Sequence, residues 1–592
     1  MPRLWRDGVL ITAACAAAYL PGLTDHGLTN WQESIRLLAA QEMQARGDWI
    51  TPTIHGEAYL AKPPLIYWCQ LAIGSVRDRA VGLFDLRLTV AIAGWLGALA
   101  TWWAARLLLR DPDQTDAEAE GGGAWADRAA LWAGLFMATG MLTARAARIG
   151  ELDILLVPST AIAVLGSVGA WTDGQGGRLA RAWVWTGLAT IGMAAAWLAK
   201  GPPGVLTAVL AVFGGAVIHA VRRGTEREPS GPGRVAIGLG AAVGGLGTAA
   251  FVLAERPIGG AVAALGAGFF VLLGAAIGGG LVKLARPRRL RVLAVDMWRT
   301  RLPLTPAIGL IPLWLWARAV ASSDVPGSDP AAAARDQAAA NLNVMDLDAP
   351  ARGLEVLGYG AGLGSAAAIA CFVWLVKDRP RLPPRAAFAV AWVLFPLAAY
   401  SALGSGSHRY LLPMLGGASI VGGAWLASWQ RDVGPRLGPI FAGAGVLGLT
   451  LFHGWWYGAG RDDLASHRSP RDFIAELLEA PGARPERLAS VDLWTPALTV
   501  YAGAPVIPYR RAESIGYPQD APPFDRLIER IEESGGAWTL VVRDPDALAG
   551  VFRDRGLEAR EVPTESAFSY DAFETRLGAL RVRSRRSAGP RW

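Results

Sequence analysis

Charged residues are scarce in this chain. Only 18% of its 592 residues are Asp, Glu, Lys or Arg, whereas 52% are hydrophobic. A soluble enzyme of this length needs more charge on its surface, so the composition excludes a water-soluble globular protein. The net charge is +7, but the basic residues stand at the ends of apolar runs and do not gather with aromatic residues. We therefore predict no nucleic-acid partner.

Cysteine is rarer still. Its three positions, Cys15, Cys69 and Cys371, lie in or beside apolar runs and show no Cys-x-x-Cys or Cys/His spacing. This pattern excludes a disulfide framework and a cysteine-based zinc site. Histidine occurs only six times, so the residues themselves predict no metal centre.

Long apolar runs make up most of the chain. A run of roughly 17 to 25 apolar residues suffices to cross a hydrocarbon core of about 30 Å. The sequence contains about thirteen such runs and predicts a polytopic α-helical membrane protein. The spans are expected at 9–23, 87–109, 129–143, 152–171, 183–198, 203–221, 235–254, 257–282, 302–320, 355–376, 386–403, 411–428 and 437–457. The apolar run 65–76 is too short to span and predicts a helix at the membrane interface.

The distribution of Lys and Arg predicts the orientation of these spans. Alternate connections are rich in both residues, as at 283–301 and 377–385. The positive-inside rule places such connections in the cytoplasm, together with the N-terminus. The remaining connections, among them the long first loop 24–86, are then expected on the outer face, as is everything after residue 458.

The C-terminal tail has a different character. From Arg461 to Trp592 the chain is charged, lacks long apolar runs and alternates helical and strand patterns. The expected helices lie at 469–478 and 524–531 and the expected strands at 488–494 and 537–543. The sequence therefore predicts two domains, a membrane domain over 1–457 and a soluble α/β domain over 458–592 outside the membrane.

Polar motifs concentrate on the predicted outer face. Cations there run against the orientation bias, and acids beside them at a membrane boundary are typical of a functional site. The motifs are Gln32/Glu33; Lys62-Pro-Pro; Arg145, Arg148, Glu151 and Asp153; Lys200-Gly-Pro-Pro; and Ser-His-Arg-Tyr-Leu-Leu-Pro at 407–413.

These residue types predict a site for an anionic group. The cations suited to hold a phosphate at membrane depth are Lys62, Lys200, Arg148 and Arg409. Glu33 and Asp153 would then act on a hydroxyl or orient a sugar. A structural interpretation stays open for the cations as well, because Arg148 could anchor a helix end and Lys200 could extend along apolar surface toward water.

A set of motifs runs through the chain in a fixed order. It comprises AQEMQARGDWITP (40–52), GEAYLAKPPLIYW (56–68), DLRL (85–88), RIGELD (148–153), KGPP (200–203), HRYLLP (408–413) and PALTVYAGAPV (496–506). This set resembles the polyprenyl-phosphate-sugar-dependent glycosyltransferases of the GT-C class. That family includes the protein O-mannosyltransferases and the ArnT-like transferases that add aminoarabinose to lipid A.

The resemblance implies a GT-C fold and an inverting transfer of a sugar. The donor would be a sugar on undecaprenyl phosphate or a similar polyprenyl phosphate, and the acceptor a hydroxyl on a lipid, glycan or protein. The reaction would take place at the outer face of the cytoplasmic (inner) membrane, among membrane lipids. No soluble cofactor is implied, and a divalent metal stays open.

The resemblance also implies roles for individual residues. The acidic pair that opens the family's first outer loop falls on Gln32 and Glu33, so an amide replaces the first acid. The family's next Arg falls on Ile35, beside Arg36, and its Glu before Lys-Pro-Pro falls on Ala61. The implied catalytic residues are Glu33, Asp153 and Gln32, and the implied phosphate-binding residues are Lys62, Tyr59, Arg148, Lys200, His408 and Arg409.

The identity of the general base and two other functions stay open at this point. Glu33 is the preferred base; the alternatives are Asp153, or a lipid-phosphate leaving group that needs too little help to require a base. The departures at Gln32, Ile35 and Ala61 also fit a relative that binds polyprenyl phosphate without transferring sugar. A secondary transporter is the third candidate, although no inverted repeat is visible.

Overall fold

The computed structural model describes residues 2–29, 31–110, 116–223, 287–335, 383–402, 409, 412–433, 437–458, 469–493, 496–511, 521–564 and 577–584. The predicted spans 235–254, 257–282 and 355–376 lie outside these ranges, as does His408.

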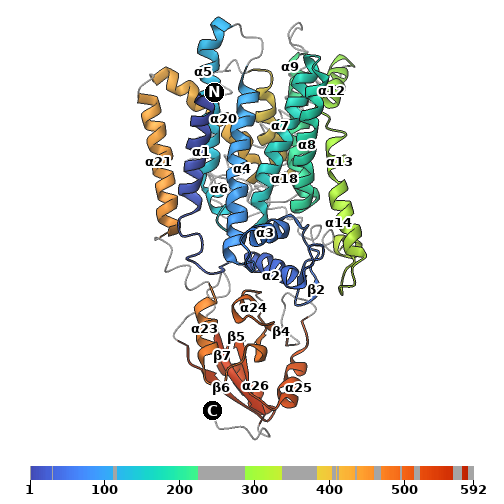
Figure 1. The fold of residues 1–592 in the computed structure, drawn as a ribbon, viewed down its shortest axis with the longest axis vertical. Helices are drawn as coiled ribbons and strands as arrows, with labels where there is room; N and C mark the ends of the chain where they lie inside the picture. Colours follow the sequence, from blue (N-terminus) through green and yellow to red (C-terminus); the bar gives the residue numbers. More distant parts are fainter. Residues whose placement is uncertain are drawn as a thin grey trace, which may run out of the picture.

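A bundle of long helices forms the N-terminal part (Figure 1). Its long members are α1 (Pro2–Tyr19), α4 (Leu83–Leu109), α5 (Asp116–Thr139), α7 (Leu156–Gln175), α8 (Leu179–Lys200), α9 (Pro202–Arg223), α18 (Ala386–Ala402), α20 (Leu415–Val433) and α21 (Leu437–Gly458). Small residues let the helices approach closely: a side chain at Gly166 of α7 would collide with the backbone of Ala189 in α8. Shorter segments are α6 (Met141–Ala146), η1 (Leu152–Leu155) and η2 (Leu412–Met414).

Apolar helices of membrane-spanning length are present within the described ranges. Four segments there are long and apolar enough to cross a membrane, namely Leu83–Leu109, Leu152–Gln175, Leu179–Lys200 and Pro202–Val221. All four overlap spans expected from hydropathy. The expected span 302–320 is instead divided into α13 (Thr305–Gly309) and α14 (Ile311–Ala321). Each of these short helices has a proline in its first turn, where the missing N–H is tolerated, and α12 (Pro287–Arg299) precedes them.

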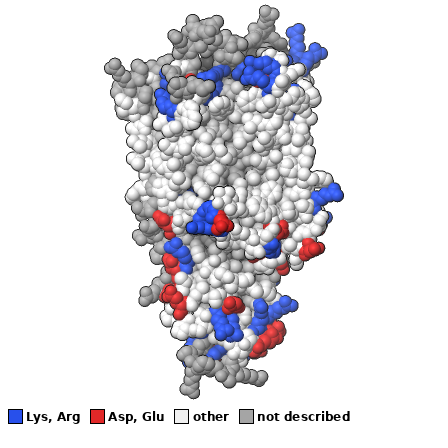
Figure 2. All heavy atoms as spheres, viewed as in Figure 1, with Lys and Arg blue, Asp and Glu red and all other residues white. Residues whose placement is uncertain are grey.

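The outer surface of this bundle separates charged from apolar regions. On the face drawn in Figure 2, Lys and Arg gather at the end where the N-terminus lies, and a band with few charges follows. Large apolar side chains such as Val184, Ile191 and Leu451 are more than half exposed on the bundle helices. A helix surface of this kind is expected to face lipid.

Two helices lie across the opposite end of the bundle (Figure 1). They are α2 (Trp31–Arg46) and α3 (Leu65–Val76), joined through the hairpin β1 (Thr53–Ile54) and β2 (Glu57–Ala58). The short helix expected at 65–76 is thus α3. The predicted outer loop also contains α2, in which the consecutive residues Glu33 to Ala40 and Met43 are buried, so the first half of the helix is enclosed on all sides.

The C-terminal part contains a five-stranded mixed sheet. Its strand order is β4-β3-β5-β7-β6, with β3 parallel to β4 and β5, and β7 antiparallel to β5 and β6. The strands are β3 (Leu488–Val491), β4 (Ile507–Tyr509), β5 (Trp538–Val542), β6 (Leu557–Val562) and β7 (Gly578–Ser584). The helices are α23 (Arg471–Glu479), η3 (Pro485–Arg487), α24 (Pro496–Ala502), α25 (Phe524–Ser534) and α26 (Pro545–Asp554). The strands expected at 488–494 and 537–543 correspond to β3 and β5.

Candidate active site

The polar centre lies where α2, η1 and the C-terminal end of α8 meet beneath the bundle. Lys62, which follows the β1–β2 hairpin, is largely buried there. Burial lowers the pKa of Lys62 to about 8, and the positive charges of Arg36, Lys200 and Arg409 contribute in the same direction, whereas Asp153 opposes them. Cations thus outnumber the acids around Lys62.

Arg36 belongs to this centre, although the sequence did not predict it as a site residue. It is 2% exposed in α2, and its Nη1 donates to Tyr67 Oη at 3.3 Å and to Tyr59 Oη at 3.4 Å. The Nε of Arg36 is buried and has no hydrogen-bond partner among the described residues. The sequence offered one signal for it, the position beside Ile35, where the GT-C motif has its arginine.

Two ion pairs hold acids close to these cations. Lys200 Nζ, at the end of α8, pairs with Asp153 Oδ1 in η1, and both side chains are less than 10% exposed. Arg409 Nε lies 3.5 Å from Glu151 Oε2. Burial raises the pKa of Glu151, the negative charges of Asp153 and Glu33 add to that effect, and Arg409 opposes it. The structure thus brings together Lys62, Tyr59, Lys200, Arg409 and Asp153.

Glu33 has a different environment. Its carboxylate is fully buried and accepts from Arg87 Nε at 2.8 Å and Arg87 Nη2 at 3.1 Å. The backbone N–H of Gly150 also donates to Glu33 Oε1, at 3.1 Å. The remaining donors of Arg87 bind backbone carbonyls of the segment before α2, at Leu23, His26 and Gly27. Glu33 therefore holds three chain segments together, and its role as a base stays a prediction.

Arg148 binds the backbone at the end of a helix. Its guanidinium donates to the carbonyl oxygens of Ala18, Tyr19 and Pro21 at the C-terminal end of α1. Those carbonyls lack partners within the helix, and a cation there also offsets the helix dipole. The contacts favour the structural interpretation, in which Arg148 anchors a helix end. Gln32 lies partly buried in the first turn of α2.

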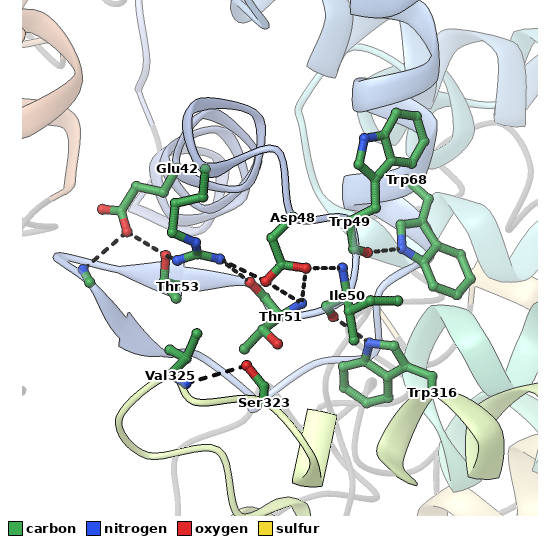
Figure 3. Close-up of polar contacts among 12 residues, drawn as sticks. Glu42, Asp48, Trp49, Ile50, Thr51, Thr53, Trp68, Trp316, Ser323 and Val325 are labelled. Atoms are coloured by element: carbon green, nitrogen blue, oxygen red, sulfur yellow. Dashed lines mark hydrogen bonds and ion pairs between the residues drawn. The ribbon is translucent and has the colours of Figure 1, made fainter. Parts of the chain in front are cut away.

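The hairpin that leads to Tyr59 is fixed by Glu42. The Glu42 carboxylate accepts from the Thr53 hydroxyl at 2.6 Å (Figure 3). It also accepts from the backbone N–H of His55 and Gly56 at 2.7 and 3.1 Å. His55 and Gly56 both have positive φ, as a tight two-residue hairpin turn requires. The partly buried Glu42 thus sets the direction in which the chain enters the site.

Two tryptophan side chains hydrogen-bond to the backbone of the segment before the hairpin. Trp68 Nε1 donates to the carbonyl of Trp49 at 2.6 Å, and Trp316 Nε1 of α14 donates to the carbonyl of Ile50 at 2.8 Å (Figure 3). Asp48 accepts from the N–H of Ile50 at 2.7 Å. These contacts join α14 to the segment that carries the site residues.

The described ranges contain no group of three or more His, Cys, Asp and Glu side chains placed to hold a metal ion.

Comparison with known proteins relates this geometry to a family. No sequence family profile matches the chain. The chain is 36% identical over 115 residues to the undecaprenyl phosphate-alpha-4-amino-4-deoxy-L-arabinose arabinosyl transferase of Pseudomonas savastanoi pv. phaseolicola, over 19% of this chain and 21% of the relative. It is 35% identical over 103 residues to the transferase of the same name from Pseudomonas aeruginosa strain LESB58, over 17% of this chain and 18% of the relative. The matches thus span about a fifth of these relatives.

The likeness in fold extends much further. The crystal structure of ArnT from Cupriavidus metallidurans bound to undecaprenyl phosphate matches with a TM-score of 0.56 and 17% identity, over 98% of this chain and 99% of that chain. The chain has the ArnT fold. The predicted resemblance to ArnT-like proteins of the GT-C class is confirmed, in fold over almost the whole chain and in sequence over part of it.

Proposed function

We propose that this ArnT-like chain is an inverting glycosyltransferase that moves a sugar from a polyprenyl phosphate to an acceptor hydroxyl. The observation that carries the proposal is the excess of buried and partly buried cations around Lys62, whose own pKa is lowered to about 8. A buried excess of positive charge is costly unless an anion neutralises it. The phosphate of a lipid-linked sugar has the charge and the membrane depth to do so. The names of the curated relatives and the undecaprenyl phosphate bound to ArnT support this choice.

The cations of the site have different roles in this proposal. Lys62 and Arg36 bind the phosphate oxygens, because Lys62 lies near the charges of Arg36, Lys200 and Arg409. The buried Nε of Arg36 is also without a hydrogen-bond partner among the described residues. Tyr59 and Tyr67 hold the Arg36 guanidinium in place. Lys200 and Arg409 add positive charge at longer range. As the bond between the anomeric carbon and the phosphate oxygen breaks, these cations stabilise the polyprenyl phosphate that leaves.

The acceptor oxygen forms the new bond to the anomeric carbon from the opposite side, and its proton passes to a base or to water. Asp153 pairs with Lys200 close to Lys62, and Glu151 lies beside Arg409, whereas both oxygens of Glu33 accept from Arg87. We therefore propose that Asp153 orients or deprotonates the acceptor. Glu33 and Gln32 would position the loop, and Arg148 would support it by anchoring α1.

We further propose a location for each part. The membrane domain 1–457 would lie in the cytoplasmic (inner) membrane, with about thirteen spans and its N-terminus in the cytoplasm. The Lys/Arg-rich end in Figure 2 supports this orientation. The sheet-containing domain 458–592 would be extracytoplasmic, on the side of Lys62. The acceptor would be a lipid, glycan or protein that reaches this face.

The test is release of polyprenyl phosphate by the purified full-length protein in lipid, from a panel of polyprenyl-phosphate sugars. We expect turnover by the wild type, and a loss of at least tenfold in Lys62→Ala. Arg318→Ala, in α14 and over the Trp314 ring, removes a cation outside the site and serves as the control. A wild type that binds polyprenyl phosphate without consuming any donor would refute the transferase and support the non-catalytic relative.

A further inference from the structure

The C-terminal part contacts the first outer loop at two places through the short helix α24. Tyr501 Oη accepts the backbone N–H of Leu28 at 2.6 Å, before α2 begins. His55 Nε2, at the turn of the hairpin, lies 2.9 Å from Thr499 Oγ1. Residues 24–29 and the hairpin turn are thus both fixed by one helix that lies outside the bundle (Figure 1).

The contact at Leu28 is close-packed. Tyr501 also hydrogen-bonds with Ser469. A Cβ added at Gly27 would collide with Ser469 Oγ and lie 2.7 Å from Tyr501 Oη, so only glycine fits there without movement of the C-terminal part. The loop and the tail are therefore fitted to one another by shape as well as by hydrogen bonds.

From this contact a continuous series of bonds leads to the cation centre. The carbonyl of Gly27 accepts from Arg87 Nη2 at 2.9 Å, and Arg87 binds both oxygens of Glu33. Glu33 Oε1 accepts the N–H of Gly150 at 3.1 Å. Gly150 directly precedes Glu151, and Asp153 follows two residues later with its ion pair to Lys200.

We propose that Tyr501 is a positioning residue: the C-terminal part, through α24, sets the placement of Asp153 by way of Leu28, Arg87 and Glu33. The catalytic consequence rests on the proposed function, but the placement itself does not. Lys62 and Arg36 stand outside this series of bonds. Loss of the Tyr501 hydroxyl should therefore disturb transfer and leave the binding of lipid phosphate largely intact.

The experiment compares Tyr501→Phe with Tyr509→Phe in the full-length protein. Tyr509 Oη accepts from Arg530 at 2.8 Å beside the sheet, so this control makes the same chemical change in the C-terminal part away from the loop. We expect Tyr501→Phe to lower kcat five- to tenfold with less than a twofold change in the Kd for undecaprenyl phosphate. Tyr509→Phe should change neither by more than twofold. An unchanged kcat in a folded Tyr501→Phe protein would overturn the proposal.

A second variant acts from the loop side. Gly27→Ala pushes against Ser469 and should reproduce the loss of kcat, and adding Ser469→Gly should restore much of it. Hydrogen exchange at residues 148–153 gives a readout that needs no turnover, and it should increase in Tyr501→Phe and in Gly27→Ala. If the wild type transfers no sugar, the proposed function fails, whereas exchange at 148–153 still decides the positioning role. Unchanged exchange in both variants would refute it.

Discussion

Arg87 and Glu33 form a fully enclosed pair, in which two guanidinium nitrogens of α4 bind the two carboxylate oxygens of α2 at 2.8 and 3.1 Å. The same arginine binds three carbonyls of the preceding segment. This buried pair therefore attaches the predicted first outer loop, 24–86, to α4. The catalytic and structural roles of Glu33 can be separated by experiment.

Removing either partner should destabilise the protein. Glu33→Gln or Arg87→Met leaves one buried group without its charge partner, which costs about 3 to 5 kcal/mol for a buried pair. Thermal unfolding of the purified protein measures this loss. The double variant should recover part of the stability, because no unpaired charge remains. If Glu33→Gln keeps wild-type stability but loses turnover, Glu33 acts in catalysis and the structural role is wrong.

The affinity for polyprenyl phosphate should decrease as the pH rises through about 8. Burial and neighbouring cations lower the pKa of Lys62 to about 8, so at higher pH the free protein loses this positive charge. Binding must then include uptake of a proton, and the Kd should rise by up to tenfold per pH unit. Titrations with undecaprenyl phosphate between pH 6.5 and about 9.5 measure the effect. Lys62→Arg keeps its charge and should show a flatter profile.

Asp153 is expected to affect turnover more than donor binding. Asp153→Asn keeps the size of the side chain and removes its negative charge, so lipid phosphate should bind at least as well beside Lys200. Turnover should fall by about 10²-fold, the scale of general acid–base catalysis. Single-turnover kinetics with donor and acceptor provide the measurement. Equal losses in donor affinity and turnover would show that Asp153 only maintains the binding site.

Stability should depend on pH through His55. Burial lowers the pKa of His55, although Glu42 and Glu57 oppose this effect. The unfolded chain then binds the proton more readily than the folded protein, so stability is complete above about pH 6.5 and falls as the pH drops through the folded pKa. The loss is at most about 1.4 kcal/mol per pH unit. Unfolding midpoints at pH 5 to about 8 should show this slope in the wild type. His55→Gln should lack it, with pH 8 as the common reference.

Most long helices and the strands β3 and β5 could be predicted from the sequence, whereas several contacts within the site could not. Apolar runs gave the positions of α4, α8 and α9 because a helix that faces lipid must be apolar along its whole length. The run 65–76 was too short to span and became α3. Strands β3 and β5 of the C-terminal sheet followed from short apolar runs, and every residue of both strands is buried. The break within 302–320 was not predicted, because hydropathy does not register the prolines that divide α13 from α14.

The sequence by itself determined a helical membrane protein, the end of the bundle where polar motifs gather, and most of the residues that meet there. Those properties depend on residue type and order along the chain. Only the tertiary structure decided that Arg36 joins Lys62, that Arg148 anchors α1, and that Glu33 is held by Arg87. It also decided that Tyr501 reaches Leu28, 473 positions away in the chain. Each of these contacts joins segments far apart in sequence, and their pairing is set by packing, which no local pattern encodes.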